Sequence, residues 1–264
     1  MNRIFLFYLL AFYTCGTSTQ NAAVVSEQTK EEFIITDSMV VKTFAIKFDS
    51  VNTLVRDNKI DKEQTLATLQ DIFPELQAVY NRLKPDCEKK ETWIFPVENY
   101  TAESIGGMQG EGYLPNGYDY FDGNKHGGHA AQDIFILDKN QDCRDDRTGK
   151  FVNIRSATDG IVVALEKDWE SGSQLRGGKY IYVYDPTDNA LFYYAHNHEV
   201  LVFVGQVIHA GETISTVGRT GLNANKQRSP THLHFMKLVL DNEFYPKPVN
   251  TYQKLLQAET NYSR

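Results

Sequence analysis

Histidine and aspartate residues recur at strand spacing in the C-terminal half of the chain. His129 and Asp133 lie four residues apart, and His232 and His234 lie two residues apart. Side chains at i, i+2 and i+4 share one face of a β-strand, so each pair would point in one direction. Two imidazoles and one carboxylate from neighbouring strands would form a three-ligand zinc site with an open fourth position, which is typical of catalytic sites. The sequence therefore predicts catalytic metal chemistry.

The other histidines are weaker candidates. Surface and hydrogen-bonded histidines are common, so the two pairs alone also leave an ordinary structural role open. His126 could replace His129 as a ligand, but no carboxylate follows it by four residues. We expect His198 at the rim of the site and His209 in a solvated turn. The helix-borne His-Glu-x-x-His pattern of many metalloproteases is absent from the sequence.

An acidic stretch offers a second metal hypothesis. Asp138, Asn140, Asp142 and Asp145 have the spacing of a calcium loop, but Cys143 stands where the sharp turn needs glycine. No glutamate closes the stretch, so we expect a solvated acidic loop.

Short strand-like runs separated by Gly, Pro, Asn and Asp must position these residues. This pattern predicts a mainly β fold, α+β overall, with an antiparallel β-sandwich or barrel-like domain over residues 88–258. The runs are 93–97, 133–137, 160–165, 180–184, 191–196, 200–204, 212–217 and 232–240.

The segment before this domain has a helical pattern. Val41, Phe44 and Phe48 begin an apolar series with spacings of three and four, which places it on one helix face. Asp61 begins a second helical stretch, and Pro74 should kink or restart it. We predict a helical hairpin over residues 36–86 that packs on another part of the fold.

The amino terminus has the layout of an export signal. A positive start is followed by an apolar run over residues 4–13, which is too short to span a bilayer as a helix. We predict a signal peptide over residues 1–15, of the lipoprotein type if Cys15 is lipidated, and a flexible tether over residues 16–35. Ordinary cleavage and a buried N-terminal helix are the alternatives.

The remaining cysteines and the charge balance set further limits. Cys87 and Cys143 would form a disulfide in an oxidising compartment, or remain two separate thiols. The 264 residues carry 27 Lys and Arg against 34 Asp and Glu, a net charge of −7. That balance lacks the basic footprint of nucleic-acid binding, so no nucleic-acid partner is expected.

Three motifs resemble one known family. His129-Ala130-Ala131-Gln132-Asp133, Tyr194-Ala195-His196 and His232-Leu233-His234 look like the signatures of lysostaphin/LytM-type zinc metallopeptidases, metallopeptidase family 23. The resemblance covers about residues 92–245 in family order, and the helical hairpin lies outside it.

The resemblance implies a zinc endopeptidase that cuts peptide cross-links or stem peptides of bacterial peptidoglycan. By match to the family motifs, His129, Asp133 and His234 hold one Zn²⁺ per chain, and His196 and His232 are the catalytic pair. Which of these two is the general base stays open.

The resemblance also implies export to the periplasm or cell envelope, with a membrane contact only through a lipid anchor. The alternative is a catalytically silent relative that binds the cell wall or activates another hydrolase.

Overall fold

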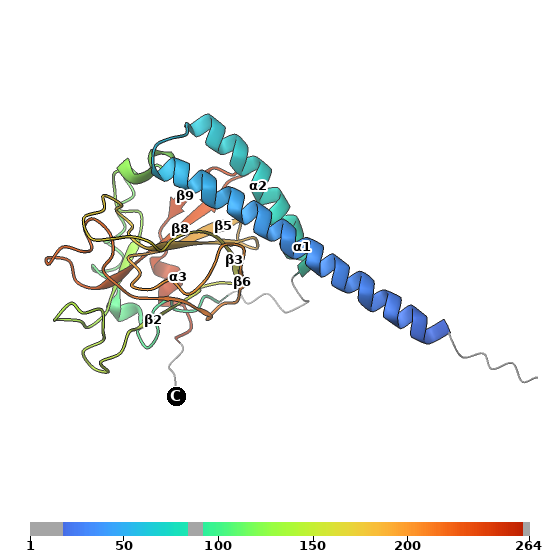
Figure 1. The fold of residues 1–264 in the computed structure, drawn as a ribbon. Helices are drawn as coiled ribbons and strands as arrows, with labels where there is room; N and C mark the ends of the chain where they lie inside the picture. Colours follow the sequence, from blue (N-terminus) through green and yellow to red (C-terminus); the bar gives the residue numbers. More distant parts are fainter. Residues whose placement is uncertain (1–17, 84–91, 261–264) are drawn as a thin grey trace, which may run out of the picture.

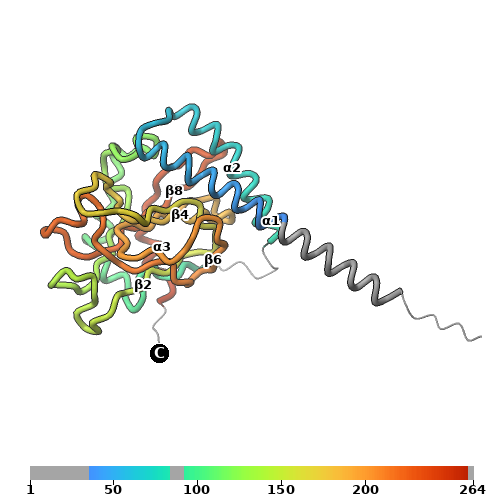
Figure 2. Tube along the Cα trace, in the orientation of Figure 1, coloured from blue at the N-terminus to red at the C-terminus, as the bar shows by residue number. Residues whose placement is uncertain are grey.

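A computed structural model describes the backbone of residues 18–83 and 92–260, and the side chains of residues 36–83 and 92–260. Two long helices, α1 (Ser18–Arg56) and α2 (Lys62–Leu83), precede a β-rich region. Figure 1 shows them side by side across one face of the main sheet, and the tube in Figure 2 follows the same path. No helix in the described part of the chain is long and apolar enough to cross a membrane.

The main sheet has seven strands and antiparallel pairing. Its order is β1-β8-β5-β4-β3-β6, and β9 pairs with β8 beyond the part that β1 occupies. The strands are β1 (Gln132–Phe135), β3 (Gly160–Glu166), β4 (Tyr180–Asp185), β5 (Ala190–Ala195), β6 (Val207–Ile208), β8 (His232–Leu240) and β9 (Pro246–Val249). A second sheet pairs β2 (Asn153–Arg155) with β7 (Thr213–Thr216). The predicted fold class, mainly antiparallel β with helices at the N-terminal side, is confirmed.

Short helices complete the fold. They are η1 (Ala102–Ser104), η2 (Tyr120–Lys125) and α3 (Tyr252–Leu256). Two predicted strands, 93–97 and 200–204, are instead extended segments with isolated bridges, such as the pairing of Val97 with Ile154. An apolar run predicts burial, and the first run is buried by packing without a regular ladder, whereas Leu201 and Phe203 of the second run are exposed.

The two faces of the main sheet are buried by different partners. Period-two alternation along β4 sends Tyr182 and Tyr184 towards the helices, and Ile181 and Val183 towards the opposite core. All six residues of β4 are buried, as expected for a strand covered on both faces.

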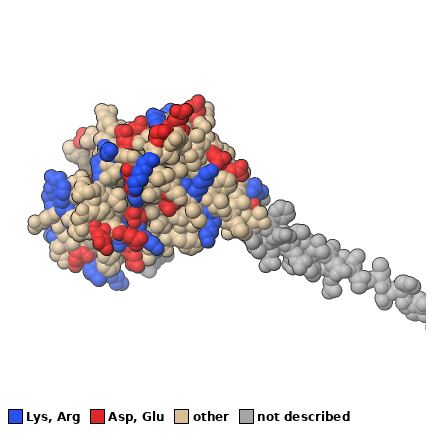
Figure 3. Space-filling model, turned by 45° about the horizontal axis from the view of Figure 1, so that its top comes forward, with Lys and Arg blue, Asp and Glu red and all other residues tan. Residues whose placement is uncertain are grey.

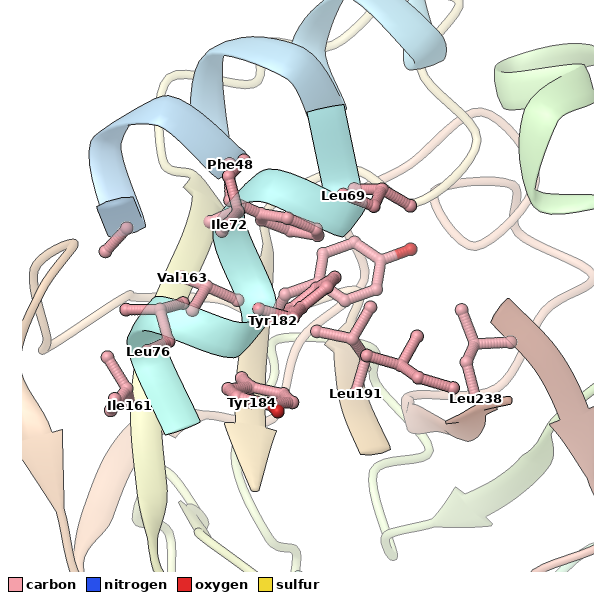
Figure 4. Packing of buried hydrophobic residues seen from close by; sticks show 14 of the residues in the cluster. Phe48, Leu69, Ile72, Leu76, Ile161, Val163, Tyr182, Tyr184, Leu191 and Leu238 are labelled. Carbon is pink, nitrogen blue, oxygen red and sulfur yellow. The ribbon is translucent and has the colours of Figure 1, made fainter. Parts of the chain in front are cut away.

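The helical layer packs on the first face through large apolar side chains. Phe48 of α1 and Phe73 of α2 are fully buried, with ring centroids 5.4 Å apart. Figure 4 shows Phe48, Leu69, Ile72 and Leu76 of the helices packed with Ile161, Val163, Tyr182, Tyr184, Leu191 and Leu238 of the sheet. The helices therefore share one core with the sheet.

Sequence signals account for the ends of this hairpin. Asn58 has a positive φ of 54° just after α1 ends, and the carboxylate of Asp61 accepts a hydrogen bond from the backbone N–H of Gln64 (2.8 Å). This is the expected cap at the start of α2. The expected restart at Pro74 is wrong, because α2 runs through that residue.

The expected flexible tether over residues 16–35 is also wrong from Ser18 onward, where α1 begins. The segment is polar, but residues 18–35 contain no Gly or Pro, so a helix nucleated by the packed part of α1 can extend through it. Residues 1–15, with Cys15, lie outside the described residues, so the signal peptide stays a prediction.

Surface charge is mixed. Figure 3 shows Lys and Arg interspersed with Asp and Glu over the visible face, which includes the helical layer. This distribution agrees with the modest net charge of −7 and gives that face no single-sign field.

Candidate metal centre

Strand register brings the two motif pairs together. β1 and β8 pair antiparallel, with Asp133 opposite His234 and Phe135 opposite His232. Directly opposed residues have Cβ atoms about 4.5–5.5 Å apart. His129 precedes β1 and is held by a bridge to Leu114. These side chains lie on the face of the sheet that the helices cover farther along β8.

The three predicted ligands converge on one point. His129 Nε2 lies 3.2 Å and His234 Nδ1 lies 3.1 Å from Asp133 Oδ1. One ligand atom from each residue can be chosen so that all three lie within 4.8 Å of one another. Tetrahedral zinc with bonds of 2.0–2.2 Å would space its ligand atoms by about 3.3 Å, so the cluster fits that ion.

The hydrogen bond on the far side of the His129 ring argues for a cation at this point. Its Nδ1 lies 2.7 Å from the carbonyl oxygen of Gly112, which can only accept. Neutral His129 therefore carries its proton on Nδ1 and presents a bare Nε2 to the Asp133 carboxylate. Two lone pairs facing each other need a proton or a metal ion between them. Backbone carbonyls often orient metal-binding histidines in this way.

The surroundings of Asp133 and His234 favour the deprotonated carboxylate and the neutral imidazole, which are the forms that bind a metal. Burial alone would raise the pKa of Asp133, but hydrogen bonding to His129 and His234 holds that pKa well below its ordinary value. Burial lowers the pKa of His234, although Asp133 opposes the shift. Both groups are therefore in the protonation state that metal binding requires.

At His129 the surroundings raise the pKa, which favours the protonated ring that cannot bind a metal. Burial would lower the pKa of His129, but hydrogen bonding and charge attraction to Asp133 raise it overall. In the absence of a metal, a proton on His129 would stabilise the carboxylate. A bound metal would replace that proton.

His196 and His232 stand beside the triad. The His196 ring centroid lies 4.9 Å from that of His232 and 5.4 Å from that of His234. His196 Nδ1 lies 2.8 Å from the Thr220 carbonyl oxygen, and His232 Nδ1 lies 2.7 Å from that of Pro230. Each neutral ring therefore carries its proton on Nδ1 and leaves Nε2 bare. Such nitrogens can accept a proton.

Burial, with a contribution from the neighbouring charges of His232 and His234, lowers the pKa of His196 well below its ordinary value. Its backbone has a positive φ of 67° where β5 ends. Gly221 permits the close approach of the Thr220 loop: a Cβ there would lie 2.9 Å from His196 Nδ1 and 2.3 Å from the Arg176 carbonyl oxygen. This neighbourhood favours a neutral imidazole.

Two connected cavities open at the metal centre. A cleft of about 400 Å³ contains the triad, His196 and His232, and a chamber of about 100 Å³ extends from it towards α1. Both are lined by His126, His129, Arg176, Gly177, Tyr193 and His234. The sequence analysis missed Arg176 and Arg228, which line the cleft. No local pattern in the sequence indicates that either residue faces the metal centre.

The remaining histidines lie apart from the triad. His126 lines the cleft, with its ring 4.8 Å from that of Tyr118. His198 stacks on Phe151 at 4.4 Å, and His209 is 76% exposed.

The acidic loop is tied to the protein, so the expectation of a solvated loop is wrong at Asp138 and Asp145, which are both buried. The Asp145 carboxylate accepts a hydrogen bond from the Tyr100 hydroxyl. The Asp138 carboxylate accepts hydrogen bonds from the backbone N–H of Cys143 and the hydroxyl of Thr231. The Thr231 hydroxyl also accepts a hydrogen bond from the Arg219 guanidinium. These contacts fix the segment that leads to His232.

The cysteine pairing stays a prediction. Cys143 forms no disulfide with any described residue, and Cys87 lies outside the described residues. Burial raises the pKa of the Cys143 thiol to about 11, so the thiol is protonated at neutral pH.

Part of the β region is similar to a known protein family. Residues 145–246 match the model of peptidase family M23. The match includes His196, His232 and His234 and begins after His129 and Asp133. It confirms the predicted resemblance. Of the two triad residues outside the match, Asp133 lies on β1 and His129 just before it. No curated protein matches the chain.

Several solved structures are similar to this chain. A zinc-containing peptidase from Vibrio cholerae has 19% identity over 65% of this chain and 41% of its own, with a TM-score of 0.39. The catalytic domain of the antimicrobial peptidase lysostaphin from Staphylococcus simulans has 22% identity over 55% and 86%, with a TM-score of 0.35. A candidate glycyl-glycine endopeptidase LytM from Ruminococcus gnavus has 20% identity over 87% and 90%, with a TM-score of 0.43. The chain thus spans less than half of the Vibrio peptidase.

Proposed function

From the M23 family match and the triad geometry, we propose that this protein is a zinc-dependent endopeptidase acting on peptide cross-links or stem peptides of bacterial peptidoglycan. The observation that carries the proposal is the convergence of His129, Asp133 and His234. Their ligand atoms have the separations and donor types of a catalytic zinc site. The family match supplies the reaction class, which geometry alone would leave open.

In this proposal His129, Asp133 and His234 would hold the zinc through His129 Nε2, Asp133 Oδ1 and His234 Nδ1. The bound ion would supply Lewis-acid polarisation of the scissile carbonyl and of the attacking water. His196 and His232 present bare Nε2 atoms to the same cleft. One accepts a proton from the attacking water, and the other stabilises the oxyanion or gives a proton to the leaving amine.

The open cleft favours an active enzyme over a silent relative. A non-catalytic regulator would need lost ligands or an obstructed site. All five motif positions are filled, and among the described side chains none from α1 or α2 lines the cleft around the triad. Of the two helices, α1 lines the adjoining chamber, through Asn52, Val55 and Arg56.

We further propose that the protein is exported to the periplasm or cell envelope. The signal-like residues 1–15 support export, and lipidation at Cys15 would anchor the protein to a membrane. The catalytic domain would span residues 88–258, with α1 and α2 packed on its sheet.

Digestion of purified peptidoglycan, with and without a zinc chelator, tests the activity. We expect soluble fragments whose new termini identify one cleaved peptide bond, and we expect chelation to abolish their release. Stoichiometric zinc loading without any peptide cleavage would favour the silent regulator.

A further inference from the structure

The chamber beside the metal cleft has a wall that the family match does not cover. Asn52, Val55 and Arg56 of α1 form this wall, and His129 and His234 stand at the end shared with the cleft. The volume of about 100 Å³ lies below the 300–1,000 Å³ typical of pockets for drug-sized ligands. A small polar group could enter, while a bulky side chain could not.

Five tyrosines are among the residues that line this chamber. Asn52 ties two of them together: its Nδ2 donates to the Tyr180 hydroxyl (3.1 Å), and its Oδ1 accepts from the Tyr120 hydroxyl (3.1 Å). Tyr182 differs, because it is only 7% exposed and its hydroxyl forms no hydrogen bond within the described part of the chain. An O–H donor is therefore left available at the chamber wall for a group that enters it.

Arginine supplies positive charge at the junction of the two cavities. Arg176 lines both; its guanidinium donates to the His126 carbonyl and forms no ion pair with any described residue. Arg228 is exposed at the cleft and likewise has no ion pair among the described residues. In contrast, Arg56 is committed to Asp57 (2.8 Å) and Glu166 (2.9 Å).

Among the described residues that line the two cavities, Asp133 is the one carboxylate. It belongs to the metal triad. The walls thus offer hydrogen-bond donors and positive charge, and their one carboxylate is committed to the triad. An ionised carboxylate is the complementary ligand, because it only accepts hydrogen bonds and pairs strongly with guanidinium.

We propose that the chamber is a subsite for a substrate carboxylate, held by Arg176 and the Tyr182 hydroxyl. The inference rests on the proposed function and narrows its substrate class. The preferred substrate is a stem peptide with a free carboxylate beside the scissile bond, bound so that the carboxylate enters the chamber. A neutral glycine bridge would leave the donors of Arg176 and Tyr182 unmatched.

Paired peptides test this assignment. A short stem peptide with a free carboxylate next to the scissile bond is compared with the same peptide amidated at that carboxylate. We expect the zinc-loaded protein to cleave the free acid with a kcat/KM about tenfold to a hundredfold higher, the range of a charged hydrogen bond. Most of the difference should lie in KM.

Substitutions locate the effect in the chamber. Arg176→Gln should remove most of the preference, and Tyr182→Phe should reduce it while keeping the ring packing. Lys226→Gln is the matched control, because it removes a positive charge on the loop before Arg228 but does not line either cavity. A preference that survives in both chamber variants, or falls equally in the control, would overturn the subsite.

Binding to the metal-free protein separates this proposal from the catalytic one. N-acetyl-D-alanine and its amide serve as probes in NMR titrations of the full chain. Tighter binding of the acid, lost in Arg176→Gln, supports the subsite even if the protein cleaves nothing, which would sink only the proposed activity. Peptide cleavage without any acid preference in binding or kinetics overturns the subsite and leaves the activity standing.

Discussion

The two ends of one sheet face show how differently the same strand can be used. On β8, side chains at alternate positions share this face: His232 and His234 belong to the metal centre, whereas Met236, Leu238 and Leu240 pack under the helices. The helix-covered end is held by apolar burial. At the open end, imidazole rings surround the Asp133 carboxylate, and a cation is needed between these groups.

This difference separates stability from chemistry. Apolar burial under α1 and α2 is present with or without a metal, because its contribution depends on area removed from water. The metal centre, in contrast, consists of polar groups that lie at the edge of that core. We therefore expect changes at one end to leave the other largely intact, and four substitutions test this expectation.

The largest effect is expected for His234→Ala. Loss of one of three ligands should remove zinc and reduce peptide hydrolysis to the level of the chelated protein, while cooperative denaturant unfolding persists. Metal analysis and activity on the same preparation check this. Retained zinc with full activity would mean that His234 is not a ligand.

His196→Ala should separate catalysis from metal binding. We expect about one zinc per chain to remain and kcat to fall by about 10²–10⁴-fold, the usual contribution of a positioned acid or base. The matched control is His209→Ala, since that side chain is 76% exposed and outside both cavities. Equal activity in the two variants would remove His196 from the mechanism.

Phe73→Ala tests the helix-covered end. Phe73 is fully buried and its ring lies 4.7 Å from that of Tyr184, so the cavity should lower the free energy of unfolding by about 3–5 kcal/mol. Met39→Ala on α1, where the side chain is 66% exposed, should change it by less than about 0.5 kcal/mol. Denaturant titration measures both. Loss of zinc affinity in folded Phe73→Ala protein would couple the two ends.

The smallest effect is expected for Asp61→Ala. Removing the side-chain cap of α2 should lower the free energy of unfolding by about 0.5–2 kcal/mol without changing zinc content. Asp71→Ala, which removes an exposed ion pair between α2 and Lys47 of α1, should cost less. The reverse order would show that the cap contributes little to the hairpin.

Local patterns predicted what local physics controls. The apolar spacing from Val41 to Phe48 marked the buried face of α1, and the i, i+4 and i, i+2 spacings marked the triad residues. Asp61 marked the start of α2. Each signal depends on helix or strand periodicity, which the sequence carries within a few positions.

Long-range contacts could not be predicted in this way. The pairing of Asp133 with His234 joins positions 101 residues apart; residue types suggested one shared site, and the family resemblance assigned His234 to it. The chamber depends on Asn52 of α1 meeting Tyr180 of β4, 128 residues away. Neither residue carries a local sign of this contact. The helical state of residues 18–35 was missed because polar composition was given more weight than the absence of Gly and Pro.

X-ray absorption spectroscopy of the zinc-loaded protein tests the three-ligand site, because it reports the ligand atoms themselves. We expect two imidazole nitrogens and carboxylate or water oxygen at about 2.0–2.2 Å, and no sulfur. Replacement of His234 should abolish this signal. A zinc–sulfur distance of about 2.3 Å, or a first shell without a carboxylate oxygen, would contradict the His129, Asp133 and His234 site.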